Sequence, residues 1–165
     1  MANHTVKTSP QVYARVGGVL YLFIIIAGIV GELFVKGRLI VSGDATATAN
    51  NIMAHQSLWR ISVTGQLMEL VCAVAVTLIL YVLLRPVSNP LALLAAFFGL
   101  VSIAAEAVTR LSLLAVSFLL GGAEYLKAFE PRQLHALAYL ALKLDGNGFG
   151  ISLLFFALCL AFRGT

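Results

Sequence analysis

The sequence contains four long apolar stretches, and three of them carry a glutamate in their interior: Glu32, Glu69 and Glu106. Arg110 follows Glu106 one helical turn later. An isolated ion near the centre of a bilayer costs roughly 2.5 to 3.5 kcal/mol, so such side chains turn toward partners, water or protons and away from lipid. We therefore expect helices that face each other around a polar interior.

The composition places the chain among integral membrane proteins. Of 165 residues, 61% are apolar and 11% are charged, whereas soluble domains have about 25% charged residues. Without a repeat, a linker or a charge block, residues 1–165 are expected to form one all-α, multi-pass transmembrane bundle in contact with the lipid bilayer. The net charge of +4 is spread over termini and loops, which argues against nucleic acid as a partner.

The lengths of the apolar stretches predict four spans, since about 20 helical residues cross a hydrocarbon core of roughly 30 Å. The predicted spans are residues 16–35, 61–84, 91–120 and 147–162. Arg85 and Pro86 end the second span, and the short connection that follows predicts an antiparallel hairpin with the third. The fourth span is short, so either the glycines before it continue the helix or the chain stops inside a longer protein.

Two polar segments on the same side of the bundle predict short interfacial helices, at about 45–55 and 131–144. Asp44 is a suitable N-cap for the first, and Pro131 suits the first turn of the second. Both segments lie near the mouth of the polar interior. They are expected either to be plain helix starts or to form a lid with four candidate residues: Asp44, Glu130, His135 and Asn147.

Small and polar residues follow one face of each of the first three spans, a pattern typical of helix interfaces in lipid. Glu69 and Arg110 are expected at similar depth, so we predict that Arg110 bridges Glu69 and Glu106 through its planar guanidinium. Two acids against one base leave one glutamate to be protonated or hydrated. The predicted intramembrane cluster comprises Glu69, Glu106, Arg110, Glu32, Gln66, Ser102 and Thr109.

The chemistry of this cluster stays open between helix packing, a pocket for an ion, proton or small polar molecule, and catalysis. No catalytic residue is identified, because Ser152 lacks the glycine context of a nucleophile elbow. No histidine lies within a predicted span, which argues against haem. Cys72 and Cys159 have no metal-ligand spacing around them, so we expect neither cofactor nor metal.

Three stretches together resemble a known family. They are residues 14–55 (ARVGGVLYLFIIIAGIVGELFVKGRLIVSGDATATANNIMAH), 80–87 (LYVLLRPV) and 121–156 (GGAEYLKAFEPRQLHALAYLALKLDGNGFGISLLFF). Their order and spacing are similar to those of bacterial membrane proteins of the domain of unknown function 4386 family. The resemblance implies a multi-spanning helical fold in a prokaryotic cytoplasmic membrane and brings no established activity. It also implies further hydrophobic helices after the fourth span, so this chain is expected to be shortened at its C-terminus.

These observations favour a non-enzymatic accessory or structural subunit of a membrane assembly, with other membrane subunits as partners. The alternative is a small transporter or binding protein that uses the Glu/Arg cluster as its site. An intramembrane enzyme is the least favoured, because no nucleophile or metal site supports it.

Overall fold

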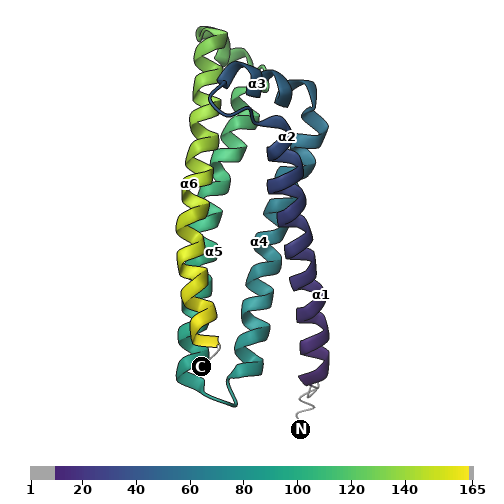
Figure 1. Ribbon diagram of the computed structural model, residues 1–165, viewed down its shortest axis with the longest axis vertical. Helices are drawn as coiled ribbons and strands as arrows, with labels where there is room; N and C mark the ends of the chain where they lie inside the picture. The colour runs from purple at the N-terminus through teal and green to yellow at the C-terminus, as the bar shows by residue number, and fades with distance from the viewer. Residues whose placement is uncertain (1–9, 164–165) are drawn as a thin grey trace, which may run out of the picture.

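The computed structural model describes residues 10–163, and this part of the chain is helical throughout, with short connections and no strand. Four long helical rods run side by side (Figure 1). The first is continuous from Pro10 to Leu39 and consists of α1 (Pro10–Ile29), a π-helical segment η1 (Val30–Lys36) and α2 (Gly37–Leu39). The others are α4 (Gln56–Leu84), α5 (Asn89–Leu119) and α6 (Pro131–Arg163). Each rod is long and apolar enough to span a bilayer, which confirms the all-α multi-pass membrane fold.

The fourth rod differs from the prediction. Residues 131–144 do not form a separate interfacial helix, because α6 runs unbroken from Pro131 to Arg163 through Gly146, Gly148 and Gly150. A glycine inside a helix costs only about 1 kcal/mol, and the extensive packing of α6 against α5 offsets that cost. The glycines therefore continue the helix, which resolves the apparent shortness of the fourth span.

The connections alternate between the two ends of the bundle. Residues 85–88 link α4 to α5 in the predicted hairpin. At the other end, the link from α2 to α4 carries α3 (Ala45–Ala54), and the link from α5 to α6 carries the short 3-10 helix η2 (Glu124–Ala128). We call this the loop end, at the top of Figure 1, and the opposite end the terminal end, because the chain enters α1 and leaves α6 there.

The best-buried apolar core lies at the loop end. Its side chains come from every rod and from α3, and include Ile52, Trp59, Leu113 and Leu142. The indole Nε1 of Trp59 donates a hydrogen bond to Ser117 Oγ at 2.9 Å, which satisfies the one polar atom of this large side chain. The core therefore joins all four rods at one end of the molecule.

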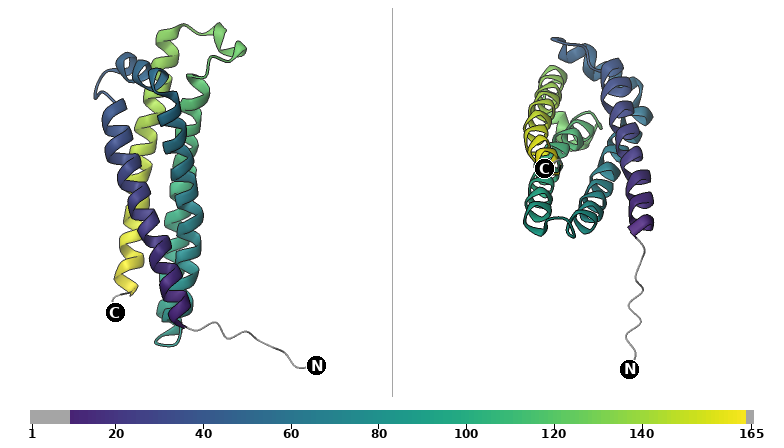
Figure 2. Two further views of the ribbon diagram at one scale, coloured as in Figure 1. Left: turned by 90° about the vertical axis from the view of Figure 1, so that its right-hand side faces the viewer. Right: turned by 60° about the horizontal axis from the view of Figure 1, so that its bottom comes forward.

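Toward the terminal end the rods form two pairs. Figure 2 shows α5 beside α6 and α1 beside α4, with α4 and α5 closing one side of the bundle. No extended packing joins α1 to α6 within residues 10–163, and no side chain of α1 is buried. Apolar side chains facing lipid need no protein cover, so this half of the bundle stands partly open.

Candidate functional site

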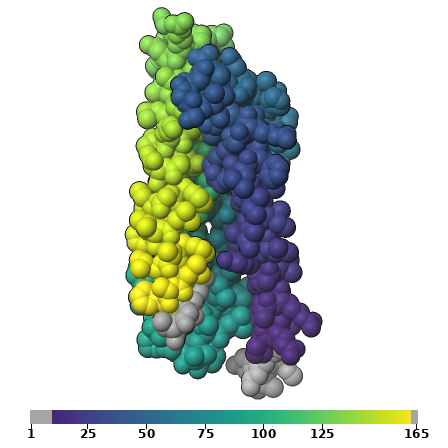
Figure 3. All heavy atoms as spheres, viewed as in Figure 1, coloured from purple at the N-terminus to yellow at the C-terminus, as the bar shows by residue number. Residues whose placement is uncertain are grey.

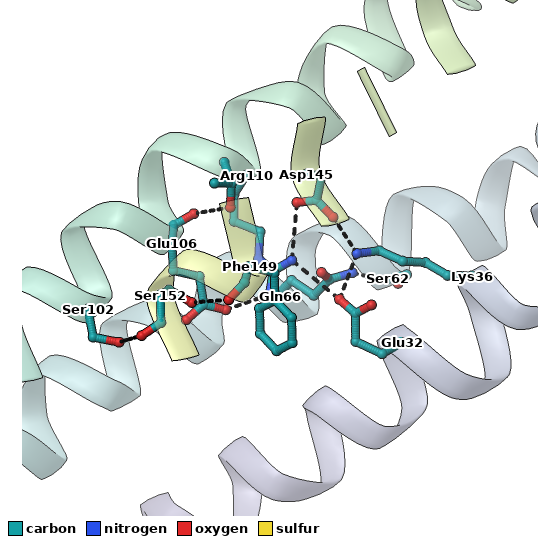
Figure 4. A network of polar contacts seen from close by, with 11 residues as sticks. Glu32, Lys36, Ser62, Gln66, Ser102, Glu106, Arg110, Asp145, Phe149 and Ser152 are labelled. Atoms are coloured by element: carbon teal, nitrogen blue, oxygen red, sulfur yellow. Dashed lines mark hydrogen bonds and ion pairs between the residues drawn. The ribbon is translucent and has the colours of Figure 1, made fainter. Parts of the chain in front are cut away.

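Five charged side chains form one network between the rods (Figure 4). We call Glu32, Lys36, Glu106, Arg110 and Asp145 the charge network. Arg110 is its centre on α5: Nη2 donates to Glu106 Oε1 at 2.5 Å, and Nη1 donates to Asp145 Oδ1 at 3.3 Å and to Glu32 Oε1 at 3.4 Å. The guanidinium thereby joins the first rod, α5 and α6.

Lys36 is the second base of the network. Its Nζ donates to Glu32 Oε1 at 2.6 Å and to Asp145 Oδ2 at 2.5 Å. Asp145 uses both carboxylate oxygens, and its side chain is only 1% exposed, while that of Arg110 is 2% exposed. Buried charges persist in proteins when they are paired in this way. With all groups ionised, three acids and two bases leave the charge network with one excess negative charge.

Local sequence explains how the network assembles. Glu106 and Arg110 are four residues apart on α5, so they share one helix face. On α6, Gly148 allows a close approach to α5, since a Cβ atom at this position would overlap Thr109 Cγ2. Gly31 does the same for η1 against α4, because its Cβ would lie 3.1 Å from Gln66 Nε2. Close packing at these two glycines accompanies the contacts of Asp145 with Arg110 and of Lys36 with Asp145.

The structure confirms the predicted Glu106–Arg110 pair, but the predicted bridge from Arg110 to Glu69 is wrong. No hydrogen bond or ion pair links these two side chains in the described part of the chain, and Arg110 contacts Asp145 and Glu32 in place of Glu69. Glu69 Oε2 is buried and has no hydrogen-bond partner among residues 10–163. The physical reason is packing: α5 packs more extensively against α6 than against α4, and Gly148 brings α6 close to α5 beside Arg110.

Asp145 and Lys36 are absent from the predicted cluster. Asp145 lies between the predicted interfacial helix and the fourth predicted span, before three glycines, and Lys36 follows the last residue of the first predicted span. A helical reading of α6 would have placed Asp145, Phe149 and Ser152 on one face, opposite the seam of α5. Lys36 had no such signal, because the π-helical turn that directs it inward has no recognised sequence pattern.

Each of the remaining predicted cluster residues donates a hydrogen bond, and of these three bonds only that of Ser102 connects two helices. Gln66 is buried, and its Nε2 donates to Ser62 Oγ at 3.1 Å. Ser102 Oγ donates to the backbone carbonyl of Ser152 at 2.8 Å and so connects α5 to α6. Thr109 Oγ1 donates to the carbonyl of Glu106 at 2.8 Å within α5.

No hydrogen bond or ion pair joins the four candidate lid residues to one another within residues 10–163. Asp44 caps α3, with Oδ1 accepting from the Ala47 N–H at 2.8 Å. Glu130 precedes α6, and its N–H donates to Gln133 Oε1 at 3.1 Å. Asn147 lies on an exposed face of α6, and His135 is half-buried, with an Nδ1 that has no hydrogen-bond partner in residues 10–163.

A cavity of about 360 Å³ lies next to the charge network, on the side of the terminal end. All four rods line it, with Glu69 and Thr77 from α4, Glu106 from α5, and Phe149 and Phe156 from α6. Figure 3 shows the surface hollowed between α1 and α6 at this level. Two carboxyl groups thus face a mainly apolar space that is large enough for a small molecule.

The arrangement favours positive charge in the cavity. Glu69 interacts electrostatically with the charge network, and in its ionised form Glu69 raises the excess negative charge of the site from one to two. Within residues 10–163, no three His, Cys, Asp or Glu side chains are grouped so that they could hold a metal ion. The site is therefore suited to electrostatic recognition of a cationic group.

Residues 16–165 match a family described as a domain of unknown function, DUF4386. The chain belongs to the DUF4386 family. No curated protein and no solved structure matches this DUF4386 chain. The family description specifies no activity, so the function of the DUF4386 chain has to be argued from the site itself.

Proposed function

We propose that this protein binds, and as a transporter moves, a small molecule or ion through the intramembrane cavity, with Glu69 as the recognition group. One observation carries the proposal: Glu69 reaches the cavity without an ion-pair partner among residues 10–163, although each acid of the charge network beside it has one. A carboxylate without a partner in a low-dielectric site costs free energy. A bound ligand that supplies the missing positive charge or proton removes that cost.

At the loop end, a contact holds α3 to α6 on the opposite side of the charge network from the cavity. Gly43 N–H donates to Tyr139 Oη at 2.7 Å, which ties the turn before α3 to the first part of α6. In this proposal α3 lies at the membrane interface, and the predicted lid residue Asp44 acts by starting that helix. The family resemblance supports a prokaryotic cytoplasmic membrane as the location.

A matched pair of glycine substitutions tests occupancy of the cavity. Gly28 lines the cavity, and a Cβ there would meet only Glu69 Oε1 at 3.7 Å, so Gly28→Leu adds its side chain to the space that a ligand would fill. Gly18 lies on the same helix, is not a cavity residue, and has no atom within 4 Å of an added Cβ. Gly18→Leu is therefore the control.

The measurement is mass spectrometry of small molecules that copurify with the protein in nanodiscs, followed by flux assays in liposomes. We expect a bound species in the wild type and in Gly18→Leu, and its loss in Gly28→Leu. Equal recovery from both variants, or no bound species and no flux in the wild type, would contradict the proposal.

A second proposal, that the protein is an accessory subunit of a membrane assembly, draws on α1. This helix is strongly apolar, has no buried side chain and leaves its face toward α6 uncovered. An accessory subunit should copurify with fixed partners after mild detergent extraction. It should also retain those partners in Glu69→Gln, which removes the recognition charge of the first proposal.

A further inference from the structure

Building on the proposed function, we infer that the ligand of the cavity is a monovalent organic cation, an amine or quaternary ammonium attached to an apolar body. The charged group lies between the carboxyl groups of Glu69 and Glu106, and the apolar body extends toward the terminal end. The ligand class follows from the charge, the lining and the opening of the cavity.

The charge balance selects a cation. Glu106 already pairs with Arg110, whereas Glu69 has no ion pair within the described residues. A ligand cation beside Glu69 would supply its missing ion-pair partner. An anionic ligand would meet two carboxyl groups in a medium that screens them weakly. The bases are occupied as well: Lys36 contacts two acids and Arg110 contacts three.

The lining of the cavity selects an organic cation over a metal ion. Hard metal cations take six or more oxygen ligands, and no group of three acidic, histidine or cysteine side chains capable of holding a metal exists in residues 10–163. Away from the two carboxyl groups the wall is apolar, with Ile25, Val76 and Phe156 among its residues. Aromatic rings such as that of Phe149 also attract cations, and this ring already lies 5.5 Å from the Arg110 guanidinium carbon.

The opening of the cavity suits a ligand that partitions into lipid. The hollow lies between α1 and α6 (Figure 3), and both helices present exposed apolar side chains at this level, such as Ile25 and Leu153. A strongly hydrated ion gains nothing from such an entrance. An amphiphilic cation, in contrast, can reach Glu69 from the bilayer without crossing the packed core at the loop end.

Benzyltrimethylammonium and neopentylbenzene test this inference. The two probes have the same shape, but a carbon atom replaces the charged nitrogen in the second. Binding of each probe would be measured by equilibrium dialysis against protein in zwitterionic nanodiscs, with empty nanodiscs as the blank. We expect the wild type to bind the cation at least about tenfold more tightly than the neutral probe, because only the cation compensates the charge of Glu69.

Three variants distinguish the effect of the Glu69 charge on binding from the effect of the cavity volume. Glu69→Gln keeps the shape of the side chain and should reduce affinity for the cation by about tenfold or more, while leaving the neutral probe unchanged. Glu124→Gln removes an exposed acid that pairs with Lys127 on the surface, and should change neither affinity. Gly28→Leu should weaken the binding of both probes, because the leucine side chain occupies part of the cavity.

The outcomes distinguish this inference from the proposed function. If Glu69→Gln loses binding of the cation but keeps binding of the neutral probe, the result supports both this inference and the proposed function. If both probes bind equally and only Gly28→Leu weakens them, the cavity binds ligands but the assignment of a cation is wrong. If neither probe binds the wild type, the inference is overturned, and the copurification experiment then decides on the proposed function. Circular dichroism of each variant verifies that the helices are intact.

Discussion

At the loop end, side chains from every rod interlock around Trp59 and Leu113, whereas toward the terminal end α1 and α6 stand apart and enclose a cavity. The charge network lies between these two regions and holds the first rod to α6. In lipid, apolar side chains gain little from being covered, so helices associate where small residues and polar contacts draw them together. Stability is therefore concentrated at the loop end and in the charge network, and the open half of the bundle is available for binding.

The largest loss of stability is expected when the guanidinium of Arg110, the centre of the charge network, is removed. Arg110→Met leaves Glu106, Asp145 and Glu32 buried or half-buried with only Lys36 to compensate them. We expect a loss of about 3 to 5 kcal/mol in the free energy of unfolding, measured by denaturation in mixed micelles. Arg132→Met, at an exposed position of the same charge, serves as the control. Equal stability of the two variants would show that the charge network does not hold the bundle together.

Truncation of apolar side chains compares the two regions directly. Leu113 is 0% exposed in the loop-end core, and Ile25 is 43% exposed beside the cavity. Leu113→Ala should cost about 2 to 5 kcal/mol through lost packing, and Ile25→Ala less than about 0.5 kcal/mol. Unfolding of both variants under the same detergent conditions measures the difference. A similar cost at both positions would mean that the open half is as tightly packed as the core.

Substitution at the close approach of α6 to α5 should lower the free energy of unfolding by a smaller amount, and a second substitution should restore it. Gly148→Ala places a Cβ onto Thr109 Cγ2, and we expect a cost of about 1 to 3 kcal/mol from overpacking. Thr109→Ala in the same chain should restore most of it, since the clashing methyl group is gone. Gly150→Ala, where no atom lies within 4 Å of the added Cβ, should be neutral or slightly stabilising. Thermal unfolding by circular dichroism compares the four chains.

The smallest effect is expected at the recognition group. Glu69 makes no ion pair or hydrogen bond within residues 10–163, so Glu69→Gln should change the free energy of unfolding by less than about 0.5 kcal/mol or increase it. The same denaturation assay used for Arg110 measures this. A large loss of stability would place Glu69 in the structural network and would remove the basis for a binding role.

The sequence alone predicted the four apolar rods, because bilayer thickness dictates their length, and it predicted the Glu106–Arg110 pair, because four residues separate them on a helix. It failed at Asp145, since three glycines made an unbroken α6 look unfavourable, and at Lys36, which lies in a π-helical turn. The cavity could not be foreseen either. Its size depends on how far the helix pairs diverge, and divergence is decided by close contacts such as that between Gly148 and Thr109, which hydrophobic periodicity does not encode.

The π-helical segment η1 has a mechanical consequence for the first rod. Such segments form i→i+5 backbone hydrogen bonds, are rare, and occur mostly as single turns inside α-helices, frequently at functional sites. Above η1, Leu39 is clamped in the core; below it, α1 touches mainly α4. Any rewinding of Val30–Lys36 into α-helical pitch would therefore rotate α1 about its own axis relative to the loop end. Tyr21, Ile25 and Gly28 would sweep across the cavity, while the loop end stayed still.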